Sequence, residues 1–497
     1  MLETKKKLSA REYVCIASML FGMFFGAGNL IFPVQMGQNA GSNVWLATLG
    51  FLITGVGLPL LGVASLGMSR SNGLLDMSSK VSKPFGKFFT LALYLTIGPF
   101  FAIPRCAATS FTIGFEQALP LGDLKWLFLL LFSATFFIAV LAFSLFPGKI
   151  LTWIGKILNP TFLVFLGVLV IVAIVSPSAH VSEVEPLGGY ATTPFIQGFL
   201  DGYSTMDALA SLAFGIVVVQ VIRDLGVKEP ASVAKSTAFS GIFSCLFMAF
   251  IYLAVTIVGT QSRGAFAPAE NGGLALAMIA KHYLGTTGLV ILAATVTFCC
   301  LKTAVALVTS CAETFNGMFP KITYRTWAIV VSAVSFLIAN LGLSLVINIS
   351  LPVLMFLYPL TIVLILLVLF GNFFKHDRSV YGFTIGFTLI GAIYDFFATF
   401  AANFKLAGFK AFLDTVGVAL PLSGFSLGWV VPSAVGLLIG LIVYFVRKKK
   451  RPVAVGFVDA ESDEPVVDGR AEEFANEVAS EIAATEPSAE TEPAPTE

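Results

Sequence analysis

The sequence has few charged residues and lacks the motifs by which many soluble enzymes are recognised. Only 12% of its 497 residues are Asp, Glu, Lys or Arg, whereas 57% are apolar; soluble domains carry about 25% charged residues. The chain contains no HExxH zinc motif, no phosphate-binding glycine loop followed by lysine, and no GxSxG nucleophile turn. We therefore expect no enzymatic activity and no cofactor, and we expect no binding to nucleic acid.

Cysteine and histidine are also scarce, and neither forms a pattern typical of a metal site. The six cysteines lie inside apolar stretches, where a free thiol behaves as a small hydrophobic group. The three histidines fall in or near predicted loops and have no metal-ligand spacing. These patterns argue against a disulfide scaffold and against a transition-metal centre.

Long apolar segments make up most of the chain. They recur from Tyr13 to Phe445, and a helix needs roughly 20 mostly apolar residues to cross a bilayer. We therefore predict an all-α membrane protein with about twelve transmembrane helices. Their approximate bounds are 12–37, 43–68, 86–116, 124–146, 150–175, 192–220, 234–260, 274–311, 324–340, 346–370, 379–401 and 427–446.

Positive charges are distributed unevenly between the predicted loops. With the N-terminus inside, 23 of the 30 Lys and Arg residues fall on the cytoplasmic side and five on the outer side; Arg105 and Lys302 fall within spans. Because positive loops remain in the cytoplasm, we expect both termini there. Residues 1–11 then form a cytoplasmic N-terminus, since the apolar run that follows is too long for a signal peptide and lacks a cleavage site.

The C-terminal residues 447–497 differ in composition from the rest of the chain. Thirteen of the 29 acidic residues lie between Asp459 and Glu497, among many Ala, Pro and Thr. A segment with so little apolar surface does not fold alone. We expect a disordered acidic cytoplasmic tail, although Phe474, Val478 and Ile482 recur at a spacing that would also suit a short amphipathic helix.

Two predicted helices are interrupted at corresponding places in the two halves of the chain. The first span contains Gly22, Gly26 and Gly28 before Pro33, and the sixth contains the run Asp-Gly-Tyr-Ser-Thr-Met-Asp at 201–207. Glycine weakens a helix by about 1 kcal/mol, and Asp and Ser compete for its backbone hydrogen bonds. The simpler explanation is that Gly and Pro are common in membrane helices.

Paired breaks, however, are typical of transporters built from inverted repeats, in which the substrate binds at mid-membrane between the breaks. We predict repeats over 12–175 and 192–370, followed by two extra helices over 379–446. An unwound segment presents N–H groups and the positive end of the next half-helix, which suit a carboxylate. Its free carbonyls suit an ammonium group or a cation.

Three segments resemble the branched-chain amino acid:cation symporter family, the bacterial "transport system II carrier" proteins. They read Phe-Gly-Ala-Gly-Asn-Leu-Ile-Phe-Pro at 25–33, Gly-Pro-Phe-Phe-Ala-Ile-Pro-Arg at 98–105 followed by Ala-Ala-Thr-Ser-Phe at 107–111, and Gly-Tyr-Ser-Thr-Met-Asp-Ala-Leu-Ala at 202–210. The resemblance extends over residues 8–446. It implies the leucine-transporter-like fold of five plus five inverted helices, with helices 1 and 6 broken. It also implies a bacterial inner-membrane protein that imports leucine, isoleucine and valine together with Na⁺.

The resemblance further implies where the substrate binds. The backbone amides of Ala27, Gly28 and Asn29 would hold the carboxylate of the amino acid, and the second break would complete the pocket. The substrate-binding residues expected on this basis are Gly26, Ala27, Gly28, Asn29, Gly202, Tyr203, Ser204 and Thr205.

Charged residues inside the spans are candidates for function, because each costs at least about 2.5 kcal/mol near the bilayer centre. Arg105 would snorkel, pair with an acid such as Asp207, or contact the substrate. Asp207 follows the second break and would cap the next half-helix or serve the site. Asp201 lies at the same break, and Asp395, outside the repeats, is interpreted as structural.

Lys302 departs from the family pattern, in which a pair of threonines usually stands at this place. In the wider fold two hydroxyls here, with carbonyls of helix 1 that would be those of Gly22 and Phe25, surround a sodium ion. Thr303 keeps one hydroxyl, and Lys302 replaces the other with an ammonium group. One hypothesis is that Lys302 substitutes for sodium, which gives proton-coupled or uncoupled transport. The other is that Lys302 pairs with an acid elsewhere and the Na⁺ site survives.

A channel or a polytopic membrane scaffold is the alternative from another functional class. Channels usually show repeated pore helices or rings of like residues, and one long asymmetric chain lacks that pattern. The partners we expect are the lipid bilayer and a branched-chain amino acid. No protein partner is indicated.

Overall fold

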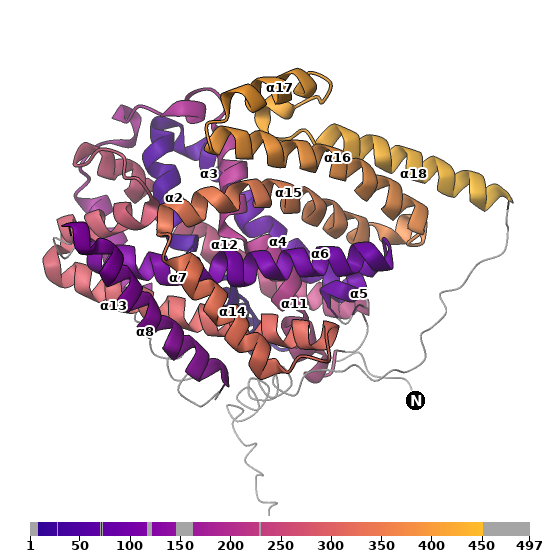
Figure 1. Ribbon diagram of the computed structural model, residues 1–497, viewed down its shortest axis with the longest axis horizontal. Helices are drawn as coiled ribbons and strands as arrows, with labels where there is room; N and C mark the ends of the chain where they lie inside the picture. The colour runs from indigo at the N-terminus through magenta and orange to yellow at the C-terminus, as the bar shows by residue number, and fades with distance from the viewer. Residues whose placement is uncertain are drawn as a thin grey trace, which may run out of the picture.

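The computed structural model describes residues 8–26, 28–69, 71, 73–116, 122–145, 163–227 and 230–450, and these residues form helices and turns without a β-strand. Most long helices run along the long axis of the molecule (Figure 1). Eight helical segments of the described chain are long and apolar enough to cross a membrane, and shorter apolar helices lie at Leu163–Val175 and Tyr324–Ala339. The chain is therefore an all-α, multi-pass membrane protein, as predicted.

Each predicted span consists mostly of helix where the structure describes it. Residues 150–162 of the fifth span, Ala27, and the tail from residue 451 onward lie outside the described residues. The helices are α1 (Ala10–Phe24), α2 (Gly28–Ala40), α3 (Val44–Leu52), α4 (Leu58–Ser69), α5 (Leu74–Ser79), α6 (Lys83–Leu95), α7 (Ala102–Phe111), α8 (Lys125–Leu145), Leu163–Val175, α10 (Pro194–Asp201), α11 (Asp207–Asp224), α12 (Pro230–Gln261), α13 (Gly272–Met318), α14 (Tyr324–Ala339), α15 (Leu343–Leu369), α16 (Arg378–Asn403), α17 (Ala407–Gly417) and α18 (Val430–Lys450).

Several spans contain irregular turns that the hydropathy pattern does not reveal. A π-helical turn, η2 (Ile53–Gly57), separates α3 from α4, and another, η3 (Thr96–Phe100), precedes α7. Such turns leave backbone groups without their usual helical partners and occur often at functional sites. Both lie in helices that pack around the centre of the bundle.

Two boundaries differ from the sequence-based prediction. The span expected at 274–311 begins at Gly272 and continues to Met318, with a kink at Gly285, whose φ of 65° suits glycine. It therefore consists of two helices joined at the kink. In addition, α17 forms where an outer loop was expected, because an 11-residue amphipathic segment is too short to register as a span.

Small residues bring the helices close together. Gly37 of α2 lies so near α12 that a Cβ atom there would overlap the backbone carbonyl of Thr256. Gly272, at the start of α13, lies equally close to the carbonyl of Ile31. Close approach through small residues is the usual way in which membrane helices pack, since lipid gives them little hydrophobic driving force.

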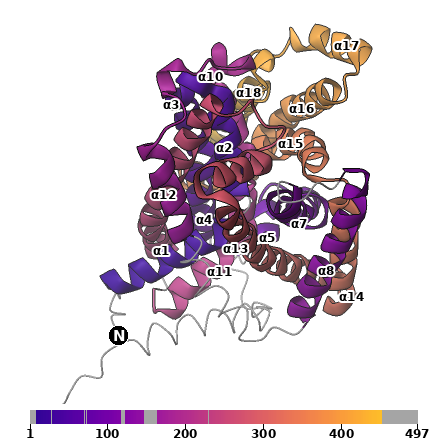
Figure 2. The same ribbon diagram turned by 90° about the vertical axis from the view of Figure 1, so that its left-hand side faces the viewer.

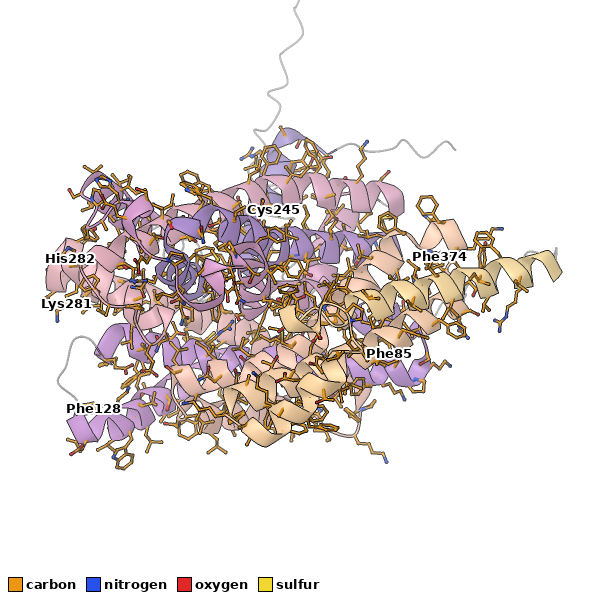
Figure 3. The ribbon with its side chains drawn as sticks, turned by 90° about the horizontal axis from the view of Figure 1, so that it is seen from above. Phe85, Phe128, Cys245, Lys281, His282 and Phe374 are labelled. Carbon is orange, nitrogen blue, oxygen red and sulfur yellow. The ribbon has the colours of Figure 1, made fainter. Side chains whose placement is uncertain are left out.

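The two ends of the bundle carry the loops that were predicted to lie on opposite sides of the membrane. Figure 3 shows Lys281 and His282 at one end and Phe374 at the other. The far end of α18 lies with the start of α16, because Arg447 donates a hydrogen bond of 2.6 Å to the hydroxyl of Ser379. In Figure 2, α16 and α18 lie at one edge of the bundle, away from α7, α8 and α14.

Candidate substrate-binding site

The first break lies between α1 and α2, as the glycine-rich sequence predicts. α1 ends at Phe24, and Phe25 is extended, with φ −74° and ψ 103°. α2 begins at Gly28, so Gly22 and Pro33 lie within the flanking helices rather than in the break. The side-chain oxygen of Asn29 accepts a hydrogen bond of 2.8 Å from the N–H of Gly26. Asn29 thus satisfies a backbone group that the helix cannot.

The second break lies between α10 and α11. A single 3₁₀ turn, η8 (Gly202–Thr205), follows Asp201, and Met206 then adopts a left-handed conformation with φ 64° before α11 begins at Asp207. The hydroxyl of Thr205 accepts a hydrogen bond of 3.3 Å from the N–H of Asp207. The four turn residues are buried, so the break lies inside the protein, where irregular backbone is tolerated.

Buried polar side chains join the two breaks. The amide of Asn29 donates a hydrogen bond of 2.6 Å to Oδ2 of Asp207 and is also bonded to the hydroxyl of Tyr252, on α12. The Tyr252 hydroxyl donates to the same Asp207 oxygen at 3.3 Å. The carboxylate of Asp207 therefore faces the first break, and the N-cap position of α11 is occupied by Met206 rather than by Asp207. The capping interpretation of Asp207 is wrong.

Arg105 enters the same region from α7. Its guanidinium donates hydrogen bonds of 2.6 Å to the carbonyl of Ser204 and 3.4 Å to that of Thr205, and it lies over the ring of Phe32 at 5.0 Å. Only 5% of the residue is exposed, so it does not snorkel. Among the described residues no carboxylate lies within ion-pair distance of it, so the ion pair with Asp207, one of the three alternatives for this residue, does not form.

α13 contributes the face that was predicted to hold a cation. The thiol of Cys299 lies 3.8 Å from the carbonyl of Phe25, and a Cβ atom on Gly26 would lie 3.6 Å from the hydroxyl of Thr303. Lys302 is in the same turn of helix, midway between the kink at Gly285 and the helix end. Among the described residues it has no ion-pair partner.

Further contacts hold the residues of the second break in place. The ring of Tyr203 stacks on that of Tyr358, on α15, with centroids 4.1 Å apart. The hydroxyl of Thr54, in η2, donates a hydrogen bond of 2.8 Å to the carbonyl of Phe199 near the end of α10. Gly202 lies against Thr54, since a Cβ there would overlap its hydroxyl.

The remaining intramembrane acids lie apart from this cluster. Asp201 accepts a hydrogen bond from the hydroxyl of Tyr190, in the segment that leads into α10. Asp395 is buried in α16, where a Cβ atom on Gly428 would lie 3.2 Å from its Oδ1. Of the predicted site residues that the structure describes, it therefore brings together the two breaks, Arg105, Asp207 and the Thr303 face of α13.

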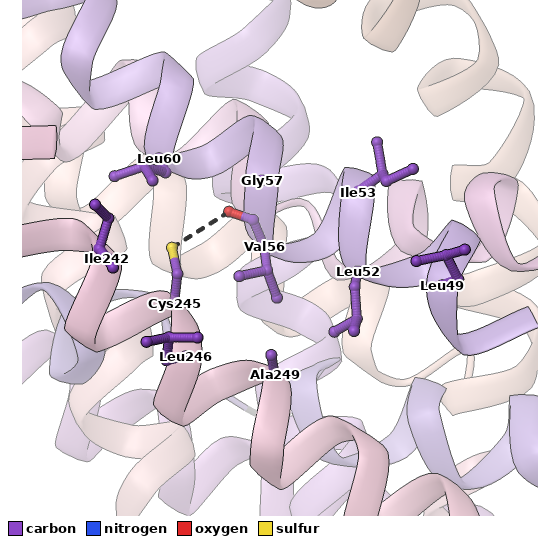
Figure 4. A pocket seen from close by; sticks show the side chains of 10 residues that line it. All are labelled: Leu49, Leu52, Ile53, Val56, Gly57, Leu60, Ile242, Cys245, Leu246 and Ala249. Atoms are coloured by element: carbon purple, nitrogen blue, oxygen red, sulfur yellow. Dashed lines mark hydrogen bonds between the residues drawn. The ribbon is translucent and has the colours of Figure 1, made fainter. Parts of the chain in front are cut away.

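A groove of about 350 Å³ lies elsewhere, between η2 and α12 (Figure 4). Its walls are apolar and include Leu49, Ile53 and Leu246, whose side chains are largely exposed. Cys245 reaches into it and donates a weak hydrogen bond of 3.6 Å to the carbonyl of Val56. With no charged group in its walls, this groove does not suit a zwitterion.

Comparisons with known proteins match this architecture. Residues 9–447 match the family described as branched-chain amino acid transport protein. The chain belongs to this family. It is 50% identical over 447 residues to the branched-chain amino acid permease BrnQ of Lactobacillus delbrueckii subsp. lactis, covering 90% of this chain and 100% of the relative. It is 36% identical over 435 residues to the branched-chain amino acid transport system 2 carrier protein of Pseudomonas aeruginosa, covering 88% and 96%.

A solved structure supports the predicted fold of this family member. Mhp1, a nucleobase-cation-symport-1 family transporter in a closed conformation with bromovinylhydantoin bound, is similar with a TM-score of 0.56 at 15% identity, over 94% of this chain and 96% of that one. At this identity the likeness concerns the fold alone. The leucine-transporter-like arrangement with broken helices 1 and 6 is thereby confirmed.

Sequence reasoning missed several residues that surround the breaks. Tyr252 lies in the apolar run Phe-Ile-Tyr-Leu-Ala at 250–254, and Tyr358 and Cys299 lie in similar runs. A lone tyrosine or cysteine in an apolar helix is usually a packing residue. Only the folded arrangement shows that these side chains point to the breaks.

Proposed function

We propose that the chain is a secondary active transporter that imports leucine, isoleucine and valine by alternating access. The observation that carries this proposal is the meeting of the two helix breaks, joined by the hydrogen bond between Asn29 and Asp207. Breaks that meet at mid-membrane present free backbone groups to a small zwitterion. Membership of the family, and relatives named as branched-chain amino acid permeases, support the choice of substrate.

In this proposal each break has a separate role. The amides at the start of α2, from Ala27 to Asn29, meet the substrate carboxylate at the positive end of the half-helix. Ala27 itself lies outside the described residues. Gly26 and the turn Gly202–Thr205 complete the pocket.

The coupling ion is a separate part of the proposal. Family resemblance implies Na⁺, held by Thr303 with the carbonyls of Gly22 and Phe25. The position of Lys302 supports a second candidate: its ammonium takes the place of the ion, and transport is proton-coupled or uncoupled. Lys302 is far from both ends of its helix, and no described acid neutralises it at ion-pair distance. An uncompensated charge so placed is expected to have a function.

We further propose that the protein lies in the bacterial inner membrane with both termini in the cytoplasm. The distribution of Lys and Arg supports this orientation. The Lys281 end of the bundle would then face outward and the Phe374 end inward (Figure 3).

Uptake by the purified protein in liposomes tests the function. Radiolabelled leucine is offered with an imposed Na⁺ gradient, an imposed proton gradient, or neither, and with isoleucine, valine or alanine as competitor. We expect saturable uptake in which isoleucine and valine compete better than alanine. Non-saturable flux would indicate a channel, and the absence of uptake in a correctly folded preparation would indicate a scaffold.

The same assay distinguishes the two coupling ions. Accumulation that requires a Na⁺ gradient would support the family mechanism and assign Lys302 a structural role. Accumulation with protons alone, or exchange without a gradient, would support replacement of sodium by Lys302. In that case Lys302→Thr, which restores the threonine pair with Thr303, should acquire a Na⁺ requirement. A Lys302→Thr variant with unchanged ion dependence would contradict the replacement.

A further inference from the structure

Arg105 carries a positive charge into the centre of the bundle, and among the described residues no carboxylate lies within ion-pair distance of it. A guanidinium has five N–H donors, and the two hydrogen bonds to the carbonyls of Ser204 and Thr205 use only some of them. The carboxylate of Asp207 faces Asn29 and Tyr252 instead. A buried cation is strongly unfavourable unless an anion or further hydrogen bonds compensate it.

The guanidinium lies at the beginning of α2. The Cα of Gly28 is so close that a Cβ atom on it would stand 2.8 Å from Nη2 of Arg105. Gly28 is the first residue of α2, where the N–H groups have no partner within the helix and the helix dipole is positive. Two sources of positive potential therefore converge on the first break, one from the backbone and one from a side chain of α7.

The contacts of Arg105 also hold its plane in place. One face lies over the ring of Phe32, and Nη1 is held by the carbonyl of Ser204. A guanidinium fixed in this way is prepared for a planar partner such as a carboxylate, which it binds through two parallel hydrogen bonds. A lysine ammonium would supply the charge but not the planar pair of donors.

We infer that Arg105 binds the carboxylate of the transported amino acid, together with the amides at the start of α2. This inference rests on the proposed function and adds a residue of the third predicted span to the substrate site. Arg105 then contributes to specificity, because it favours amino acids over analogues of the same shape that lack the carboxylate. The glycine at position 28 leaves room for the guanidinium beside the break.

Arg105 would have a purely structural role if it only donated hydrogen bonds to the free carbonyls of the second break. The two roles differ in how they depend on the ligand. A structural arginine contributes equally to the affinity for every ligand. A carboxylate-binding arginine raises the affinity for leucine but contributes little to the affinity for leucinol, in which an uncharged CH₂OH group replaces the carboxylate. The comparison of these two ligands therefore distinguishes binding from support of the fold.

The experiment measures equilibrium binding of leucine and leucinol to the purified full-length protein, from the stabilisation that each ligand gives against heat. The variants are Arg105→Gln and Arg105→Lys. Loss of hydrogen bonds to a charged group is expected to weaken leucine binding by about 10- to 100-fold. Leucinol binding should stay near its wild-type value. Arg105→Lys, which keeps the charge, should lose less than Arg105→Gln.

Arg263→Gln is the matched control, because Arg263 also donates to a backbone carbonyl, that of Gln38 at 2.7 Å, but lies away from the breaks. It should keep the wild-type preference for leucine over leucinol. Equal losses for both ligands in the Arg105 variants, or an unchanged affinity for leucine, would overturn the inference. A wild-type protein that neither binds nor transports leucine would instead overturn the proposed function.

Discussion

Asn29, at the start of α2, donates a hydrogen bond of 2.6 Å to Asp207, at the start of α11. The two residues are 178 positions apart in the sequence, and each follows the break in its own helix. Both are almost completely buried. A motion that separates the first span (α1 and α2) from the sixth span (α10 and α11) must therefore break or rearrange this bond. The strength of the bond thus affects how the two repeats move relative to each other.

Removal of the Asp207 carboxylate should destabilise the protein and stop transport. In Asp207→Ala, the amide of Asn29 loses one of its two acceptors and the hydroxyl of Tyr252 loses its acceptor, at a cost of about 1–3 kcal/mol per buried group left without a partner. Asp207→Asn retains an acceptor oxygen and should unfold at a temperature between those of Asp207→Ala and the wild type. Thermal unfolding in detergent and initial rates of leucine uptake measure these effects.

Asp123→Asn is the control for this pair of variants, because Asp123 lies on an exposed turn before α8. It should unfold and transport as the wild type does. If Asp207→Ala also behaved as the wild type in both measurements, the hydrogen bonds between the breaks would contribute nothing to stability or to transport.

The stacked rings of Tyr203 and Tyr358 should stabilise the second break through their faces rather than their hydroxyls. Their centroids are 4.1 Å apart and their planes differ by 13°, and such pairs contribute about 0.5–1.5 kcal/mol beyond simple burial. Tyr358→Leu should therefore lower the unfolding temperature, whereas Tyr358→Phe, which keeps the ring, should change it less. Equal destabilisation by both substitutions would show that the hydroxyl matters instead.

Two glycines in membrane helices should differ sharply in their tolerance of a methyl group. At Gly37 a Cβ atom would overlap the carbonyl of Thr256, and overpacking of this kind costs about 1–3 kcal/mol. At Gly382, in α16, the same atom would meet no atom within 4 Å. Gly37→Ala should reduce the amount of folded protein recovered from membranes, and Gly382→Ala should not. A stable Gly37→Ala variant would contradict the close packing of α2 on α12.

His376 should make stability depend on pH at one end of the bundle. It lies in the loop between α15 and α16, and its Nδ1 is 2.8 Å from the hydroxyl of Tyr381. Burial, and then the positive charge of Lys80, lower the pKa of His376 below its usual value of 6.5. Between the lowered pKa and the pKa of the unfolded chain, the unfolded state binds more protons, so stability rises with pH across this window.

The stability that comes from His376 is thus fully present above about pH 6.5 and is lost as the pH falls toward the lowered pKa. Unfolding temperatures measured from pH 8 to pH 5 check this expectation. His376→Asn, which suits the positive φ of 51° at this position, should flatten the dependence below pH 6.5. An unchanged slope in the variant would assign the effect to other groups.

The sequence alone predicted the helical spans and both breaks, because long apolar runs favour a membrane helix, and clusters of Gly, Asp and Ser interrupt it, through local interactions. It identified Gly26, Asn29 and the turn from Gly202 as the interrupted segments, and the structure confirms the interruptions. The partners of Arg105 could not be predicted in this way. Hydropathy shows that a charge is buried but not whether it faces an acid or, as here, two backbone carbonyls.

Other features depended on tertiary contacts that no local pattern contains. Tyr252 looks like any aromatic residue of an apolar helix until α12 packs beside α2 and α11. The kink at Gly285 was hidden because hydrophobic residues continue on both sides of it. The direction of the Asp207 side chain stayed undecided for the same reason: the local sequence also suits a helix cap, and only the fold shows that the amide of Asn29 binds the carboxylate.

We propose that the two breaks together form the binding site of an amino acid. A structure determined with leucine bound tests it most directly. We expect leucine between Gly26–Asn29 and Gly202–Thr205, with its carboxylate at the start of α2 beside Arg105. Leucine bound elsewhere, for example in the apolar groove between η2 and α12, would contradict the account.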